Sequence, residues 1–209
     1  MNSVGFASLL CSRLCHDLVS PVGALSNGLE ILADEQDETV RGQVLDLLEQ
    51  SARQTANRLQ FFRLAFGAAG GFGALVDPRE GQKAVEAFFS GSKVALVWNC
   101  TVPSLPKSAV KLLLNLALLA GEGLIRGGRL TVDIRSGNGG TQAVIAAAGE
   151  RFLLSDAARA AMKGEIAEDE LEPRTAPAYL AGIVARELGV EIAIEDEGQG
   201  ETRFKIQLG

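Results

Sequence analysis

The sequence is poor in several residue types, and each shortage excludes a class of protein or of chemistry. Among its 209 residues there is a single histidine, so any imidazole chemistry must take place at His16. The three cysteines cannot all pair within one chain, which favours a reduced, cytoplasmic protein over a secreted one. The net charge of −6 argues against a nucleic-acid binder, because neutralising phosphates requires clustered lysine and arginine.

Long hydrophobic runs are missing as well. No apolar stretch approaches the roughly 20 residues that a membrane-spanning helix needs, and no basic segment precedes the apolar residues of Met1 to Leu10. We therefore expect neither a membrane span nor a secretory signal. The hydrophobic content of 47% and the charged content of 22% are ordinary for a globular protein, which excludes general disorder.

Residues 1–70 carry two apolar stripes with helical spacing. Apolar residues recur in steps of three and four from Leu10 to Leu32, and a second stripe runs from Val44 to Phe66. The polar run Asp34 to Glu38 separates them and can form a turn, which predicts an antiparallel helical hairpin. One stripe per helix does not enclose a core. A homodimer is therefore expected, in which two hairpins form a four-helix bundle.

Residues 71–209 predict a second domain with an α+β sandwich fold, a sheet covered on one face by helices. Apolar periodicity and turn residues indicate the elements. The expected helices are Pro78–Phe89, Pro106–Leu124 and Ala176–Leu188; the expected strands are a buried one at Val94–Trp98, then Leu130–Ile134 and Gln142–Ala147 around a turn at 137–140. Val190–Ile194 should pair with Phe204–Leu208 across a loop at 196–200, with Glu191 and Glu195 facing Arg203 and Lys205.

His16 projects roughly opposite the first apolar stripe, so its ring should be exposed. The other side chains on that face are small or compact, which lets another protein approach closely: Ser12, Ser20, Gly23 and Asn27. A helix surface offers little of the oxyanion pocket that acyl transfer needs. Acceptance of a phosphoryl group instead needs one free ring nitrogen and a tautomer fixed at the other, a role available to Asp17. From the pattern alone, a solvated surface histidine is the alternative interpretation.

The residues around His16 also carry a resemblance. Cys15 to Glu30 resembles the phosphoacceptor box of bacterial histidine kinases, in which a His-Glu or His-Asp pair is followed four residues later by a polar residue and a proline, here Ser20-Pro21. The run His-Asp-Leu-Val-Ser-Pro-Val-Gly-Ala from His16 resembles more narrowly the ChpT-type histidine phosphotransferases. Over nearly the whole chain, this implies a histidine-kinase-like architecture with a hairpin at 1–70 and a degenerate ATPase-like domain at 71–209. It implies that His16 is phosphorylated.

The boxes with which histidine kinases bind ATP are incomplete here. Asn115 keeps the first of two asparagines expected on a helix, but Leu119 stands where the second would ligate Mg²⁺, and leucine offers no oxygen. The stretches Ala146–Phe152 and Arg174–Gly182 lack the expected aspartate and glycine runs. Five carboxylates within Glu165–Glu172 would repel a triphosphate, although a solvated acidic loop also explains them. We therefore expect no ATP binding.

Without ATP the expected chemistry is transfer from a receiver-domain aspartate to His16 and on to another receiver, with Mg²⁺ supplied by the receiver and no cofactor of the chain's own. Ser20 can donate a hydrogen bond to a phosphoryl oxygen, and Arg13 can offset its charge, although a solvated Arg13 is equally compatible. The receiver-docking candidates are Leu9, Ser12, Gly23, Asn27 and Arg58. The resemblance implies a hybrid histidine kinase upstream and response regulators of the CtrA type downstream.

The cysteines and the aromatic residues are interpreted as structural residues. Cys11 and Cys15 with His16 lack a fourth metal ligand and are expected to be partly buried apolar cysteines. Trp98 and the pairs Phe61-Phe62 and Phe88-Phe89 are expected in the core. The sequence also allows two other functions. One is an ATP-dependent histidine kinase with divergent nucleotide boxes, and the other is a scaffold that docks receivers without taking phosphate.

Overall fold

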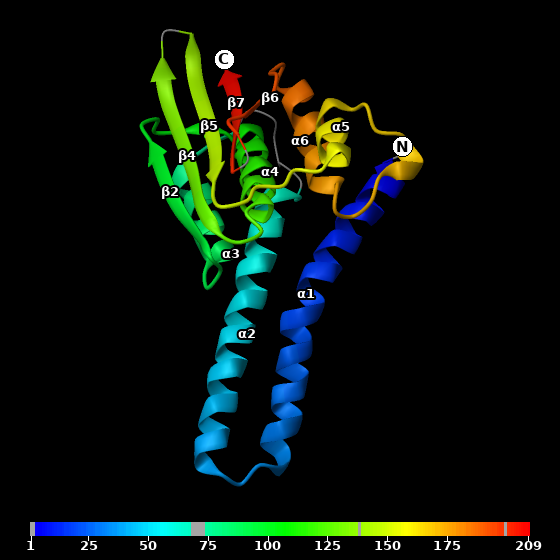
Figure 1. Ribbon diagram of the computed structural model, residues 1–209, viewed down its shortest axis with the longest axis vertical. Helices are drawn as coiled ribbons and strands as arrows, with labels where there is room; N and C mark the ends of the chain where they lie inside the picture. Colours follow the sequence, from blue (N-terminus) through cyan, green and yellow to red (C-terminus); the bar gives the residue numbers. More distant parts are fainter. Residues whose placement is uncertain (1–2, 68–73, 138, 199) are drawn as a thin grey trace.

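The computed structural model describes residues 3–67, 74–137, 139–198 and 200–209, and it shows a long helical hairpin with an α/β domain at its open end (Figure 1). The hairpin consists of α1 (Ser3–Asp34) and α2 (Glu38–Ala65), as predicted. Asp37 caps α2 by accepting hydrogen bonds from the backbone N–H groups of Thr39 and Val40, which lowers the pKa of the Asp37 carboxyl. The expected division at residues 70 and 71 lies outside the described residues.

The α/β domain follows the predicted order of helices and strands, with additions. Its helices are α3 (Pro78–Phe89), α4 (Lys107–Gly123), α5 (Asp156–Lys163), the 3₁₀ turn η1 (Glu168–Glu170) and α6 (Ala176–Glu187). Its strands are β1 (Leu75–Val76), β2 (Val94–Cys100), β3 (Leu105–Pro106), β4 (Gly128–Gly137), β5 (Gly140–Ala148), β6 (Ala193–Asp196) and β7 (Glu201–Leu208). The short pair β1 and β3, helix α5 and the turn η1 were not predicted.

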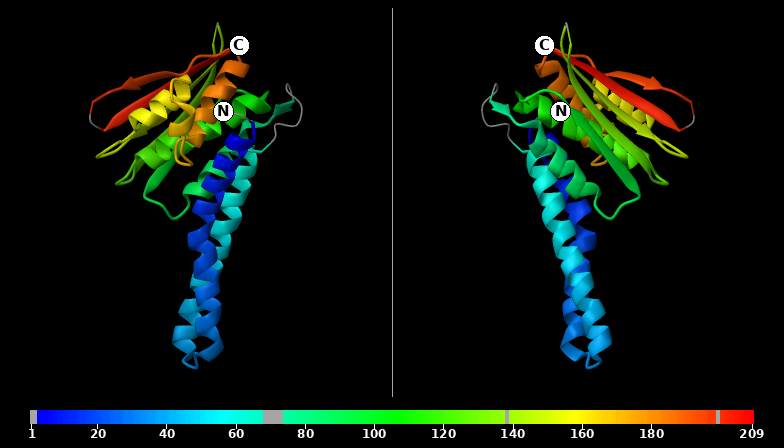
Figure 2. Two further views of the ribbon diagram at one scale, coloured as in Figure 1. Left: turned by 90° about the vertical axis from the view of Figure 1, so that its right-hand side faces the viewer. Right: turned by 90° about the vertical axis from the view of Figure 1, so that its left-hand side faces the viewer.

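The main sheet has the strand order β2-β4-β5-β7-β6, and only the pair β2–β4 is parallel. Alternation places Leu130, Val132 and Ile134 of β4 in the core, as the sequence predicts. Helices cover this inner face (Figure 2). The outer face carries polar side chains, among them Asp133, Gln142 and Arg203. The resulting α+β arrangement confirms the predicted fold class.

Two details of the predicted sheet are wrong. β2 is an edge strand whose Val97 is 39% exposed, not a fully buried strand, because helices cover only one face of the sheet. β6 begins at Ala193, so Glu191 lies outside the β6–β7 ladder. The rest of the predicted charge pairing is confirmed, since Glu195 is the register partner of Arg203 and binds Lys205 Nζ at 2.6 Å.

The open end of the hairpin is anchored in the domain by aromatic and polar contacts. Phe61 and Phe62 are buried, as predicted, and the Phe61 and Phe88 rings lie 4.4 Å apart between α2 and α3. The Phe6 ring packs on Tyr179 of α6 at 5.2 Å. The Asn115 side-chain amide on α4 donates to the Ala65 carbonyl at 3.0 Å. The first turns of α1 and the last turns of α2 are therefore held by the domain.

The rest of the hairpin leaves apolar residues uncovered in a single chain. Leu29 is 61% exposed and Leu45 is 55% exposed. Nearer the domain, a groove of about 500 Å³ between the two helices is lined by residues of both predicted stripes, among them Leu10, Leu14, Leu59 and Phe62. Within the described ranges, each helix is too short or too polar to cross a membrane.

Candidate functional site

His16 lies on the outer surface of α1, and 74% of its side chain is exposed. This confirms the predicted accessibility of the ring. Its Nδ1 lies 3.1 Å from Oδ1 of Asp17, which is an acceptor and therefore favours the tautomer with hydrogen on Nδ1. That tautomer places a lone pair on Nε2, at the opposite edge of the ring, where an incoming group can reach it.

Asp17 differs from its neighbour in being largely enclosed, with 12% of its side chain exposed. While Oδ1 faces the imidazole, Oδ2 accepts hydrogen bonds from both Nε and Nη2 of Arg13 at 3.1 Å. The two carboxylate oxygens thus serve different partners. A carboxylate bound on both sides has a fixed plane, which is what orienting an exposed ring requires.

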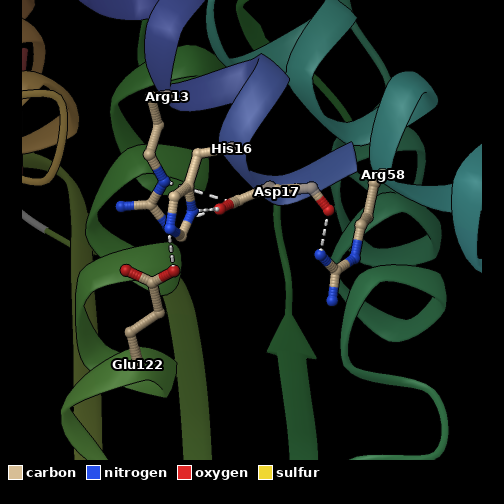
Figure 3. A network of polar contacts seen from close by, with 5 residues as sticks. All are labelled: Arg13, His16, Asp17, Arg58 and Glu122. Atoms are coloured by element: carbon tan, nitrogen blue, oxygen red, sulfur yellow. Dashed lines mark hydrogen bonds and ion pairs between the residues drawn. The ribbon is translucent and has the colours of Figure 1, made fainter. Parts of the chain in front are cut away.

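Arg13 does not occupy the place expected for it. Only 7% of its side chain is exposed, and its guanidinium is shared by Asp17 and by Glu122 of α4 (Figure 3). Burial by itself would lower the pKa of Arg13, but the two carboxylates outweigh it and raise that pKa. A solvated Arg13 is therefore wrong. Its charge is engaged within the protein, because residue 13 faces α4 one helical turn before Asp17.

Pro21 leaves a backbone carbonyl of α1 without its helical donor, and Arg58 binds that carbonyl. In a continuous helix the carbonyl of Asp17 would accept from the N–H of residue 21, but proline has no N–H to donate. Arg58 of α2 donates Nη1 to this carbonyl instead. The contact also confirms that the Gln54 to Phe61 part of α2 lies beside His16. A receiver contact by Arg58 stays a prediction, with its guanidinium already bound to the backbone of α1.

The remaining predicted site residues lie along α1, before and after His16. Ser12, Ser20 and Asn27 are exposed. A Cβ at Gly23 would meet no atom within 4 Å beyond its chain neighbours and the backbone of its own helix, so this position leaves open space. Leu9 is half-buried and packs against the core, which leaves less of it for a partner.

Exposure of the thiols differs from expectation. Cys11 and Cys15 are both exposed, and the prediction that they are partly buried is wrong. They lie on a part of α1 that forms an open surface with Ser8 and Ser12. Among the residues that the structure describes, no three His, Cys, Asp or Glu side chains are grouped so as to hold a metal ion.

The residues at the kinase-like nucleotide positions are used for packing. Asn115 is fully buried, and its amide donates to the carbonyls of Ala65 and Lys111. Leu119 is also buried. Lys111 donates to the carbonyls of Phe66 and Gly67, and its partial burial lowers its pKa. Asn115 and Lys111 thus tie α4 to the end of α2.

Glu122 is the site residue that sequence reasoning missed. It lies 109 residues from Arg13, and no local motif marks it. Although 37% of its side chain is exposed, desolvation of the carboxylate raises the pKa of Glu122, and Arg13 offsets only part of this effect. Asp17 adds to the increase, and Arg174 opposes it.

The raised pKa of Glu122 predicts a pH dependence of stability. The folded protein holds a proton on this carboxyl more tightly than the unfolded chain, so the free energy of unfolding should decrease as pH rises above the ordinary value of 4.5 and passes the folded pKa. Glu122→Gln should remove this component and be at least as stable as wild type at pH 7. Urea unfolding of both proteins across this range measures the difference. A variant that loses stability at neutral pH would contradict the prediction.

Comparisons with known proteins give consistent matches. A family model described as the histidine phosphotransferase C-terminal domain matches residues 78–200. Protein phosphotransferase ChpT of Brucella abortus (strain 2308) is 34% identical over 198 residues, covering 93% of this chain and 91% of that protein. A structure described as a bacterial phosphotransferase at 1.7 Å matches with a TM-score of 0.87 and 31% identity, covering 99% of this chain and 98% of that one. Full-length ShkA in complex with AMPPNP matches with a TM-score of 0.50 and 17% identity, covering 95% of this chain and 45% of that one; this likeness shows the fold alone.

Proposed function

Because this chain belongs to the histidine phosphotransferase family, we propose that it relays a phosphoryl group between receiver-domain aspartates through Nε2 of His16. The observation that carries the proposal is the exposed imidazole whose Nδ1 faces Asp17 at 3.1 Å. This arrangement fixes the tautomer that a nucleophile needs at the accessible nitrogen. An exposed ring on a helix also suits a partner that brings the remaining catalytic groups with it.

The proposed transfer is balanced without a further proton donor or acceptor. The Nε2 lone pair attacks the phosphorus of an aspartyl phosphate, the bond between phosphorus and the carboxylate oxygen breaks, and its electron pair leaves with the receiver's carboxylate. The imidazole becomes cationic while keeping its proton on Nδ1, and Asp17 stabilises this charge. Attack by a second receiver's carboxylate reverses these steps and returns the lone pair to Nε2. Ser20, one turn from His16, is proposed to donate to a phosphoryl oxygen.

We also propose that the relay runs without ATP. Its support is chemical: Leu119 has no oxygen for Mg²⁺, and the amide of Asn115 is occupied by the carbonyls of Ala65 and Lys111. In this proposal the receiver brings both the Mg²⁺ and the acceptor carboxylate. The donor would be the receiver of a hybrid histidine kinase and the acceptors response regulators of the CtrA type, all in the cytoplasm.

Phosphate donors can be compared directly to test this function. Receiver domains phosphorylated with labelled acetyl phosphate, then freed of it, should pass acid-labile label to the protein, whereas γ-labelled ATP with Mg²⁺ should pass none. Label from ATP would support the kinase alternative. A receiver that binds the protein without transferring label would support the scaffold alternative.

A homodimer is proposed from the uncovered apolar stripe of the hairpin. The groove lined by Leu14 and Leu59 continues along α2 toward Leu45, which lies on the same side of that helix. A second hairpin laid against this side would cover these residues in a four-helix bundle. His16 projects about 200° around α1 from Leu14 and so stays outside the bundle.

A pair of leucine substitutions tests the dimer. Leu45 and Leu47 are both exposed, at 55% and 45%, but they lie about 200° apart around α2 and therefore on opposite sides of the hairpin. Leu45→Glu should convert the dimer to a monomer, because each chain would bury an unpaired carboxylate in the apolar interface. Leu47→Glu is the matched control and should leave it dimeric. Sedimentation that finds wild type monomeric, or only Leu47→Glu dissociated, would contradict the proposed interface.

A further inference from the structure

A chain of polar contacts connects His16 to the α/β domain. From the imidazole it passes to Oδ1 of Asp17 at 3.1 Å, from Oδ2 of Asp17 to Arg13 at 3.1 Å, and from Arg13 to Glu122 (Figure 3). The first three residues belong to α1 and the last to the final turn of α4. The exposed ring is thus connected through two side chains to a residue of the other domain.

The two carboxylate oxygens of Asp17 bind different partners. Arg13 donates both Nε and Nη2 to Oδ2, which leaves Oδ1 for Nδ1 of His16. Asp17 would otherwise rotate freely about its terminal bond, since carboxylate torsions are broad. Arg13 itself is held by Glu122, because the same Nη2 contacts both carboxylates. Glu122 is therefore one of the two carboxylates that hold the guanidinium, and the one that ties it to α4.

We infer that Glu122 is a positioning residue for His16, which acts through Arg13 and Asp17 to keep the proton on Nδ1 and the lone pair on Nε2. Its consequence for transfer rests on the proposed function, but the tautomer is a property of the free protein. The α/β domain then has a part in the reaction although Glu122 touches neither phosphate nor receiver. Loss of Glu122 shifts the ring toward the tautomer with hydrogen on Nε2, which has no lone pair there.

A purely structural role for the Glu122–Arg13 pair makes a different prediction. The hairpin is also anchored through Phe61 on Phe88, Phe6 on Tyr179 and Asn115 on Ala65. These contacts do not involve Glu122, so the domain stays attached when its charge is removed. A residue that only braced the domain would leave the tautomer of His16 unchanged.

The single histidine makes the test simple. Untagged protein labelled with ¹⁵N-histidine contains one imidazole, and its two ring nitrogens report the tautomer at about pH 8.5, where an ordinary imidazole is neutral. Wild type should carry its proton mainly on Nδ1. Glu122→Gln should shift the proton toward Nε2 and slow transfer from a phospho-receiver by about 10-fold, without lowering the melting temperature.

Two further variants complete the test. Glu150→Gln breaks an exposed ion pair with Arg126 in the same domain and should behave as wild type. Arg13→Lys keeps the charge but loses the fork that binds Oδ2, and should shift the tautomer as Glu122→Gln does; it carries the test if Glu122→Gln does not fold. A wild-type tautomer in both folded variants would overturn the inference while leaving the relay intact. A wild type that takes no phosphate but shows the Nδ1 proton would instead overturn the relay.

Discussion

A His16→Gln protein is expected to accept no phosphoryl group from a phosphorylated receiver. The chain has one imidazole, so no second histidine can replace it. Glutamine is similar in reach but its amide nitrogen is not nucleophilic, and the position is exposed enough to tolerate the change. Acid-labile label after incubation with a phospho-receiver measures the loss, which should be complete.

The control for this variant is its fold and its binding. Wild type and His16→Gln should melt at the same temperature and bind the unphosphorylated receiver equally well, since glutamine alters only the ring. Acid-labile label on His16→Gln would place the phosphoacceptor elsewhere and contradict the assignment.

The second large effect is expected at Asp17. Asp17→Asn should slow transfer about 100-fold, the scale on which a positioned acid–base group contributes. An asparagine amide can donate to Nδ1, which stabilises the tautomer with hydrogen on Nε2, and it cannot compensate the cationic ring. The matched control is Asp133→Asn, an ion-paired aspartate on β4 that contacts Arg135 rather than the site.

Single-turnover kinetics with a saturating phospho-receiver separates this effect from docking. The first-order rate should decrease while the receiver concentration at half saturation changes little, because Asp17 is largely enclosed and offers little surface to a partner. An unchanged rate in Asp17→Asn, or an equal loss in Asp133→Asn, would show that Asp17 does not set the reactivity of His16.

Periodicity predicted the parts of the fold that repeat a pattern over several turns. The hairpin, the exact span of α3 and the alternation of β4 follow from the spacing of apolar residues. Helix α5 was missed although Ser155 accepts a hydrogen bond from the Ala158 N–H at its start and Gly164 ends it with a positive φ of 78°. Eight residues are too few for a periodic signal, but these caps could have revealed it.

Only the part of the site that lies on a single helix could be predicted from the sequence. The exposure of His16 and its contact with Asp17 follow from positions on one helix. That Arg13 is buried follows from α4 lying beside it, which no local pattern contains. Pro21 could have shown that the Asp17 carbonyl loses its helical donor, but choosing Arg58 as the replacement requires the packing of α2 against α1.

The exposure of the edge strand β2 also depends on contacts that its own residues do not reveal. The run Val94 to Trp98 is apolar enough to suggest a buried strand, yet its alternate residues are exposed because helices cover only one face of the sheet, and one of its edges is unpaired because β2 ends the order β2-β4-β5-β7-β6. Strand order is set by long-range pairing, and residue composition does not encode it locally.

Identifying the atom that carries the phosphoryl group is the most direct test of the proposed role of His16. Protein labelled with ¹⁵N-histidine and phosphorylated by a receiver can be observed by ³¹P and ¹⁵N NMR, where one-bond coupling identifies the phosphorylated nitrogen. We predict coupling to Nε2 of His16, with the proton retained on Nδ1. Phosphorus bonded to Nδ1, or found on any other side chain, would contradict the proposed role of the His16–Asp17 pair.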